Sequence, residues 1–181
     1  MPLVIGAKQR IFRGRWLDVW ETEFLDKNGE RQTWEWIDRK GAVYVFPITP
    51  EQHVVLIRNF RIPIERYVIE MPAGVKDHGE NDQETAKREL QEETGYCAQH
   101  IIPVRSWPYR PGTSNAHARG FIATGLIKGE RIGGDATEDI EVIEVPRDQL
   151  FDFYFSLPQE ELFDTTIIAL HALALHLGIN G

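Results

Sequence analysis

The stretch of residues 74–96, GVKDHGENDQETAKRELQEETGY, decides the fold. Residues 82–94 within it are mostly good helix formers. Asn81 or Asp82 can cap the first turn, and Gly95 stands where a helix commonly ends. The sequence therefore predicts a helix over residues 82–94 that stops at a glycine.

The C-terminal half of this helix carries three carboxylates. Side chains three and four residues apart are neighbours on a helix, so Glu89 lies beside both Glu92 and Glu93. The helix macrodipole disfavours negative charge at this end, so the cluster costs stability unless cations neutralise it, and Mg²⁺ suits oxygen ligands. Arg88 can reach Glu84 and Glu92 and orient the cluster. The ordinary alternative is a solvated helix face.

The spacing of the charged residues and glycines resembles the Nudix box at every defined position. These positions are Gly74, Glu80, Arg88, Glu89, Leu90, Glu92, Glu93, Gly95 and Tyr96. The resemblance implies the Nudix fold, which is an α+β fold. In it, helices lie on both faces of a mixed β-sheet as an α/β/α sandwich, and the box forms a loop–helix–loop. It also implies hydrolysis of a diphosphate linkage between a nucleoside and another group.

By this resemblance, Glu89 and Glu93 are direct metal ligands, and Glu92 is a ligand or supports one closely. The carbonyl of Ala73 is a further ligand, while Glu80 acts in support. Mg²⁺ is the expected metal, with Mn²⁺ as a substitute. Such ions shield phosphate charge, lower the pKa of bound water and stabilise the leaving phosphate. The expected catalytic residues are Arg88, Glu92, Glu93 and Glu138.

Residues 58–74, RNFRIPIERYVIEMPAG, resemble the segment that precedes the box in ADP-ribose and other nucleoside-diphosphate-sugar pyrophosphatases. By that likeness, Arg61 pairs with a diphosphate or terminal-ribose oxygen, a role suited to its planar charged fork. Glu70 belongs to the same expected substrate-binding group. A surface salt bridge is the alternative interpretation of Arg61.

Residues 109–114, YRPGTS, resemble the Pro-Gly loop of the same branch, which makes Pro111 and Gly112 candidates for substrate binding. Many members place a glutamate shortly after this loop, whereas residues 115–117 here are Asn-Ala-His. A tight turn is the alternative interpretation.

Residues 134–141, GDATEDIE, resemble a loop that supplies an extra acid in these enzymes. Glu138 fits that position best, as a ligand of a third metal or as the base that takes a proton from the attacking water. Asp135 is the reserve candidate, and a solvated acidic loop is the alternative.

The N-terminal part predicts an antiparallel hairpin, because residues 10–38 alternate polar and apolar side chains around the turn DKNG at 26–29. Residues 1–40 are expected to form a β-hairpin and dimerisation region, and residues 41–181 the Nudix hydrolase domain. In the resembling branch, the N-terminal sheet packs across a homodimer, so a homodimer is expected here.

Aromatic residues of this region are expected to bind the base. By resemblance, Trp16 and Trp34 stack on the nucleobase, Glu35 recognises its exocyclic amine, and Arg39 is a further substrate contact. Strand alternation places Trp34 and Glu35 on opposite faces, so the two roles need a bend or different subunits. Tryptophans that anchor the core or a dimer interface are the alternative.

Other segments predict a mixture of strands and helices without regular alternation, which favours an α+β fold. A second hairpin is expected around residues 49–52, and Asp164 is expected to cap a last helix running to about residue 177. The expected strands are residues 41–47, 53–58, 67–71, 101–107, 118–124 and 140–145.

Composition limits the setting and the partners. The 181 residues include 28 acidic residues and 20 Lys and Arg, a formal net charge of −8, which argues against nucleic acid and anionic membranes as partners. Cys97 is the one cysteine, which fits a reducing, cytoplasmic setting and excludes an internal disulfide. We expect Cys97 to be a small core residue. The longest apolar stretch is too short to span a bilayer.

The sequence therefore predicts Mg²⁺-dependent hydrolysis of ADP-ribose or a related nucleoside diphosphate sugar to a nucleoside monophosphate and a sugar phosphate. A GDP-mannose-type or broad-specificity nucleoside-diphosphate-sugar pyrophosphatase is the alternative within the enzyme class. Outside that class, the alternatives are a non-catalytic regulator that binds a nucleotide sugar and a structural dimerisation module.

Overall fold

The computed structural model describes residues 1–132 and 139–181, and these form two compact units. The units are Met1–Gly41 with Ser106–Ala118, and Ala42–Arg105 with Arg119–Gly181. The expected division at residue 40 into a dimerisation region and a hydrolase domain stays a prediction.

The first unit contains an antiparallel sheet in which the predicted hairpin is confirmed. Its strands are β1 (Leu3–Val4), β2 (Gln9–Arg13), β3 (Asp18–Leu25) and β4 (Arg31–Asp38). Strands β3 and β4 pair in continuous register up to Leu25 and Arg31. The turn between them closes through the Gly29 N–H, which donates to the Asp26 carbonyl at 3.1 Å. Gly29 has a φ of 85°, a left-handed conformation that glycine adopts without a steric penalty.

The second unit contains two further sheets. One includes β5 (Ala42–Pro47), β8 (Ala73–Val75), β9 (Tyr96–Pro103) and β11 (His117–Lys128), and the other has the order β12-β6-β7-β13. The strands of the second sheet are β6 (His53–Arg61), β7 (Arg66–Glu70), β12 (Ile140–Pro146) and β13 (Leu162–Phe163). Strand β13 runs parallel to β7, whereas β6 pairs antiparallel with both β7 and β12.

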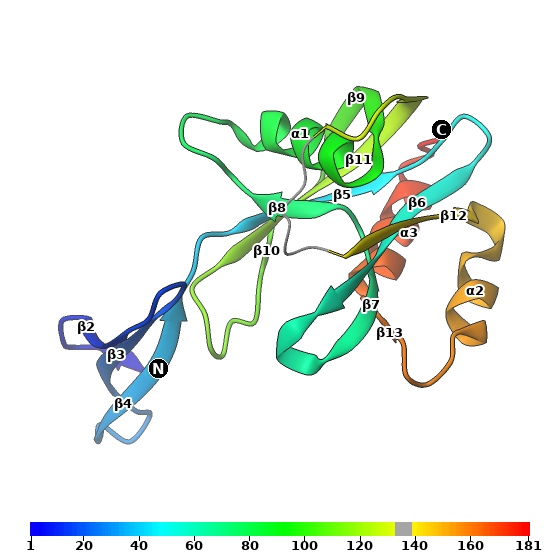
Figure 1. Ribbon diagram of the computed structural model, residues 1–181. Helices are drawn as coiled ribbons and strands as arrows, with labels where there is room; N and C mark the ends of the chain where they lie inside the picture. Colours follow the sequence, from blue (N-terminus) through cyan, green and yellow to red (C-terminus); the bar gives the residue numbers. More distant parts are fainter. Residues whose placement is uncertain (133–138) are drawn as a thin grey trace. The chain divides into compact units, whose positions relative to one another are not determined.

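Helices cover opposite faces of β5. The helices of this unit are α1 (Asp82–Thr94), α2 (Leu150–Ser156) and α3 (Thr166–His176). Val43 and Val45 of β5 belong to the same buried cluster as Leu90 of α1. The ring of Phe46, which points the other way along the strand, lies 6.1 Å from that of His171 on α3. Figure 1 shows α1 and α3 on the two sides of β5, the layering expected of an α/β/α sandwich.

The second predicted hairpin is wrong in its pairing, although both strands and the tight turn exist. Strand β5 lies between β8 and β11, whereas β6 lies between β7 and β12 in the other sheet. Ile48, directly after β5, forms an isolated bridge with Val54 of β6, where the chain passes from one sheet to the other. Both strands are largely buried runs of apolar residues, and such runs do not specify which strand will pair with them.

The C-terminal region differs from expectation in two details. Helix α3 begins after the cap position Thr165, while the Asp164 carboxylate accepts hydrogen bonds from the Thr166 N–H at 2.9 Å and hydroxyl at 2.7 Å. Helix α2 was not predicted, because its short aromatic run, LFDFYFS, has no clear helical periodicity. In the described part of the chain, no helix has the length and apolar character needed to cross a membrane.

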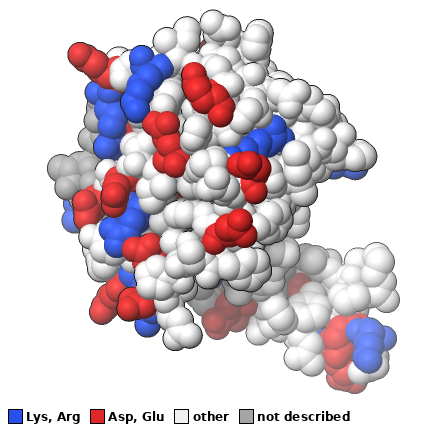
Figure 2. Space-filling view, turned by 90° about the vertical axis from the view of Figure 1, so that its right-hand side faces the viewer, with Lys and Arg blue, Asp and Glu red and all other residues white. Residues whose placement is uncertain are grey.

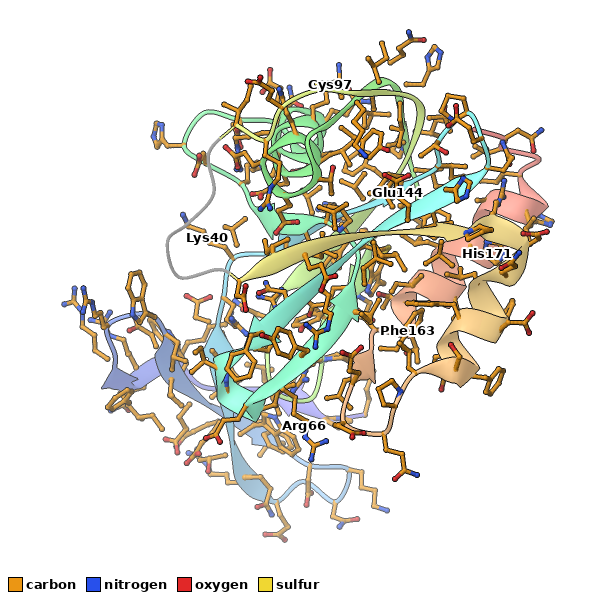
Figure 3. All side chains as sticks on the ribbon, turned by 45° about the vertical axis from the view of Figure 1, so that its right-hand side comes forward. Lys40, Arg66, Cys97, Glu144, Phe163 and His171 are labelled. Atoms are coloured by element: carbon orange, nitrogen blue, oxygen red, sulfur yellow. The ribbon has the colours of Figure 1, made fainter. Side chains whose placement is uncertain are left out.

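Cys97 is exposed, which corrects the expectation of a core residue. It lies on β9 at the outer side of the unit, as Figure 3 shows. The preceding residue, Tyr96, is 6% exposed and packs in the core cluster, so strand alternation turns Cys97 outward.

On the face shown in Figure 2, acidic and basic side chains lie interspersed.

Candidate active site

Helix α1 is positioned by caps at both ends. The Asn81 side chain accepts hydrogen bonds from the N–H groups of Gln83 and Glu84, each at 3.0 Å, and the Glu84 carboxylate accepts from the Asn81 N–H at 2.8 Å. This reciprocal capping box fixes the first turn. At the other end, Gly95 has a φ of 79° and donates its N–H to the Gln91 carbonyl at 2.9 Å. The predicted bounds of the helix are confirmed.

Two carboxylates of α1 are buried against strand β8. Glu89 is 9% exposed and Glu93 is 5% exposed. Glu93 Oε2 accepts a hydrogen bond from the Ala73 N–H at 2.9 Å. A Cβ added at Gly74 would overlap the Glu89 carboxylate, so the β8 backbone passes directly over that side chain. The absence of a side chain at residue 74 is what allows this close approach.

Arg88 holds the carboxylate cluster to the loop before the helix. Its Nη1 lies 2.8 Å from Glu89 Oε1 and 2.8 Å from Glu92 Oε2. Its Nε donates to Glu80 Oε1 at 2.8 Å and its Nη2 to the Val75 carbonyl at 3.1 Å. The pKa of Arg88 is raised, mainly by the hydrogen bond to Glu80. The predicted contact with Glu92 is confirmed.

The other predicted partner of Arg88, Glu84, is wrong. Glu84 lies at the right spacing on the helix, but its carboxylate is used in the capping box with the Asn81 N–H. Arg88 pairs with Glu80 instead, which also accepts a hydrogen bond from the Thr85 hydroxyl at 3.0 Å. Helical spacing alone does not show which carboxylate the N-terminal cap will take.

The pairing of Glu80 with Arg88 predicts a pH dependence of stability. The hydrogen bond from Arg88 lowers the pKa of Glu80 from its ordinary value of 4.5 to about 2. Stabilisation from this ionised carboxylate is therefore complete above pH 4.5 and is lost as the pH falls towards 2. We expect Glu80→Gln to lower the urea midpoint at pH 7. The difference in urea midpoint between the parent and the variant should shrink as the pH falls from 4.5 to about 2. Glu160→Gln, at an exposed glutamate, is the control; a constant difference at every pH would contradict the pairing.

The chemistry of the donor set fits a divalent cation. Glu89, Glu92 and Glu93 bring hard oxygen donors together at one helix end, two of the three side chains are buried, and Arg88 offsets part of their charge. Among residues 1–132 and 139–181, no three acidic, histidine or cysteine side chains already stand at metal-ligand spacing. The Arg88 guanidinium lies within 2.8 Å of both Glu89 and Glu92 in this arrangement.

The last residue of the box, Tyr96, is held by a contact with strand β12. The Tyr96 hydroxyl donates to Glu144 Oε1 on β12 at 2.7 Å, and Lys128 Nζ lies 3.0 Å from the same oxygen. Burial, followed by the hydrogen bond to Glu144, raises the pKa of Tyr96. Figure 3 shows Glu144 on its strand. This contact ties the segment after α1 to the second sheet.

Arg61 and Glu70, both predicted to bind substrate, form an ion pair with each other. Arg61 Nε donates to Glu70 Oε2 at 2.9 Å, and its Nη2 donates to the same oxygen at 2.5 Å. The Arg61 side chain remains 41% exposed, whereas that of Glu70 is 18% exposed. Burial raises the pKa of Glu70, against the lowering by Arg61. The Arg61 side chain thus stays partly exposed within this ion pair.

The first unit brings two other candidates together. Trp34 Nε1 donates to the Gly112 carbonyl at 2.9 Å, and the Ile37 N–H donates to the Thr113 carbonyl at 2.8 Å. Pro111 lies in the same turn, which closes between Arg110 and Thr113. The contact between Trp34 and Gly112 joins residues 78 positions apart, which the sequence did not indicate.

The remaining candidates of this unit lie at its surface. Trp16, in the turn between β2 and β3, is 87% exposed, and Trp34 is 55% exposed. Glu35 is exposed on β4, and the Arg39 N–H donates to the Asn115 side chain at 3.1 Å. Glu138 and its reserve, Asp135, lie outside the described residues.

One contact at the carboxylate cluster was not predicted from the sequence. Arg131 Nε donates to the Glu92 carbonyl at 3.2 Å, and Arg131 Nη1 donates to the Ile140 carbonyl at 3.3 Å. A cation at a helix C-terminus is favourable, but this one comes from a segment 39 residues further along the chain. No local pattern indicates it.

The fold and the box together define a Nudix hydrolase. The NUDIX domain model matches residues 38–167, more than half of the chain, so the chain belongs to the Nudix family and is an enzyme of that class. Nudix hydrolases generally use divalent metals.

Three known proteins illustrate the relationship. The chain is 35% identical to "ADP-ribose pyrophosphatase" of Bacillus subtilis (strain 168), over 77% of this chain and 76% of the relative. It is 32% identical to "Methanol dehydrogenase activator" of Bacillus methanolicus, over 92% of this chain and 90% of the relative. A solved structure described as "Crystal structure of ADP compounds hydrolase" shares the fold, with a TM-score of 0.81, 23% identity, and coverage of 98% of this chain and 96% of that one.

Proposed function

We propose that the protein hydrolyses the diphosphate bond of ADP-ribose or a related nucleoside diphosphate sugar, releasing a nucleoside monophosphate and a sugar phosphate. The observation that carries the proposal is the pair of buried carboxylates, Glu89 and Glu93, beneath Ala73 and Gly74. Burying two like charges is costly, and a divalent cation is the natural compensation. The Bacillus subtilis relative is named for activity on ADP-ribose.

The proposed site uses the residues of the box. Glu89, Glu92 and Glu93, with the Ala73 carbonyl, would hold Mg²⁺, for which Mn²⁺ substitutes, and Glu138 is proposed as a further ligand or base. The bound cation would shield the diphosphate and lower the pKa of a water. Arg88 keeps Glu89 and Glu92 oriented through its contacts with both carboxylates and with Glu80.

Substrate binding is proposed for two groups of residues. Arg61, whose side chain is partly exposed, would bind a diphosphate or ribose oxygen, while Glu70 fixes its orientation. In the other unit, Trp16 and Trp34 are exposed aromatic surfaces suited to stacking on a base. We also propose substrate-binding roles for Glu35, Arg39, Pro111 and Gly112. A homodimer built through residues 1–40 is proposed as well. A monomer by light scattering at working concentration would exclude the homodimer.

A phosphatase-coupled assay tests the proposed function. The chain is supplied with Mg²⁺ and, separately, ADP-ribose, GDP-mannose, UDP-glucose, NADH and diadenosine polyphosphates, with EDTA as the control. We expect phosphate release to be fastest with ADP-ribose or one nucleotide sugar and to disappear with EDTA. Fastest release from GDP-mannose, or equal rates with all the sugars, would favour the alternative within the class. No release from any of them would contradict the proposal.

A regulatory function is the second candidate, because the Bacillus methanolicus relative is named as an activator of methanol dehydrogenase. This candidate predicts that a nucleotide sugar raises the unfolding temperature without being hydrolysed. The retained carboxylate cluster favours the enzyme, since a protein that only binds its ligand does not need three crowded carboxylates. Thermal shift and turnover, measured on the same sample, separate the two functions.

A further inference from the structure

Asn59 of strand β6 is buried, and its amide oxygen is not hydrogen-bonded within the described chain. The residue is 2% exposed, and nothing in residues 1–132 or 139–181 donates to its Oδ1. Most buried polar groups are paired, because an unpaired one has lost its hydrogen bonds to water without replacement. An amide in this position of a strand core therefore requires an explanation beyond packing.

Strand alternation places Asn59 on the face of β6 that is turned towards α1. Val55, four residues earlier on the same face, belongs to the buried cluster that contains Leu90 of α1. Arg61, two residues later, is also on this face. Glu70 joins the same face because it pairs across the strands with Ile57. Asn59 thus lies in one row with the Arg61–Glu70 ion pair, facing the helix that carries the carboxylate cluster.

The two residues directly opposite Asn59 on the neighbouring strands offer its side chain no partner. Its register partners are Val68 on β7 and Ile140 on β12, both apolar. By contrast, the Arg58 side chain, on the opposite face, has protein partners. Its Nε donates a hydrogen bond to Glu161 at 2.6 Å, and its guanidinium lies 3.5 Å from the centre of the Tyr67 ring. Among the described residues, the Asn59 amide oxygen is therefore a buried acceptor on the face towards α1 that has no protein partner.

We propose that Asn59 accepts a hydrogen bond from an O–H group bound in the active site. The donor is either a water held by the divalent cation or a hydroxyl of the sugar, and both present the same chemistry to the amide oxygen. The proposal rests on the proposed function, because it takes the face of α1 with Glu89 and Glu93 as the site of hydrolysis. Asn59 lies within the segment 58–74 whose resemblance was noted, but the sequence predicted no binding role for it.

Asn59→Val and Asn59→Thr form the test, because valine and threonine have the same shape and differ by a hydroxyl. We expect Asn59→Val to lower kcat/KM for ADP-ribose about tenfold, the value of one hydrogen bond, while its urea midpoint stays the same or rises. Asn59→Thr should lose less activity, since its hydroxyl can still accept. Leu56→Val, at a fully buried residue on the opposite face of β6, is the control for a general disturbance of the strand.

The two sources of the O–H donor predict different effects of Asn59→Val on Mn²⁺ binding and on KM, and either effect supports the proposal. A metal-bound water predicts weaker Mn²⁺ binding, measured by electron paramagnetic resonance without substrate. A sugar hydroxyl predicts unchanged Mn²⁺ binding and a higher KM. Unchanged kinetics in Asn59→Val would overturn the proposal, as would a large loss of stability. If the parent chain itself hydrolyses none of the substrates, the proposed function has failed instead.

Discussion

Replacing Glu93 with glutamine is expected to abolish turnover while leaving the fold intact. Glu93 is 5% exposed, and its Oε2 accepts a hydrogen bond from the Ala73 N–H. Glutamine keeps the shape and can present its amide oxygen to the same N–H, but it removes the charge that a divalent cation requires. We expect kcat with ADP-ribose to fall roughly 10³-fold, as when one electrostatic contact to a reacting group is lost.

The stability of Glu93→Gln distinguishes loss of chemistry from loss of fold. Because Glu93 lies one helical turn from the buried Glu89, removing its charge relieves repulsion, so the unfolding temperature without metal should not fall. Added Mg²⁺ should raise the unfolding temperature of the parent more than that of the variant. Glu160→Gln, at an exposed position, should match the parent in both measurements. Full activity in Glu93→Gln would remove Glu93 from the proposed site.

Gly74→Ala is expected to have the second largest effect. The added Cβ would overlap the Glu89 carboxylate, so either that side chain or strand β8 must move. Residue 74 is not among the positive-φ glycines, so the backbone conformation itself suits alanine. We therefore expect a fall in kcat/KM of roughly 10²-fold, comparable to the cost of a misplaced catalytic group, together with a lower urea midpoint.

A coupled variant tests whether the effect of Gly74→Ala passes through Glu89. In a Glu89→Ala background the overlapping carboxylate is absent, so adding Gly74→Ala should cost little further stability. Gly129→Ala is the matched control, because its added Cβ would meet its nearest neighbour at an ordinary 3.5 Å. Equal losses from Gly74→Ala in both backgrounds would show that Glu89 is not the group displaced.

Local signals in the sequence predicted the central helix and the first hairpin. Asn81, Glu84 and Gly95 specify both ends of α1 through contacts within a few residues, so the bounds of the helix were predictable. The turn at residues 26–29 likewise specifies the β3–β4 register locally. The box spacing then predicted which carboxylates would lie together, and the structure places Glu89 and Glu93 against β8.

Contacts between distant segments could not be predicted in the same way. The pairing of β5 with β8 and β11, rather than with β6, depends on segments far along the chain. Arg131 reaches the end of α1 from 39 residues away, and Trp34 reaches Gly112 from 78. The buried amide of Asn59 was invisible as well, since only the register with Val68 and Ile140 shows that it has apolar neighbours.

The most direct test of the central claim is product analysis by chromatography after incubation with ADP-ribose. Three samples are compared: the parent chain with Mg²⁺, the parent chain with EDTA, and Glu93→Gln with Mg²⁺. Metal-dependent hydrolysis at the carboxylate cluster predicts AMP and ribose 5-phosphate in equal amounts in the first sample and unchanged ADP-ribose in the other two. Unchanged ADP-ribose in all three, or equal product with EDTA, would contradict it.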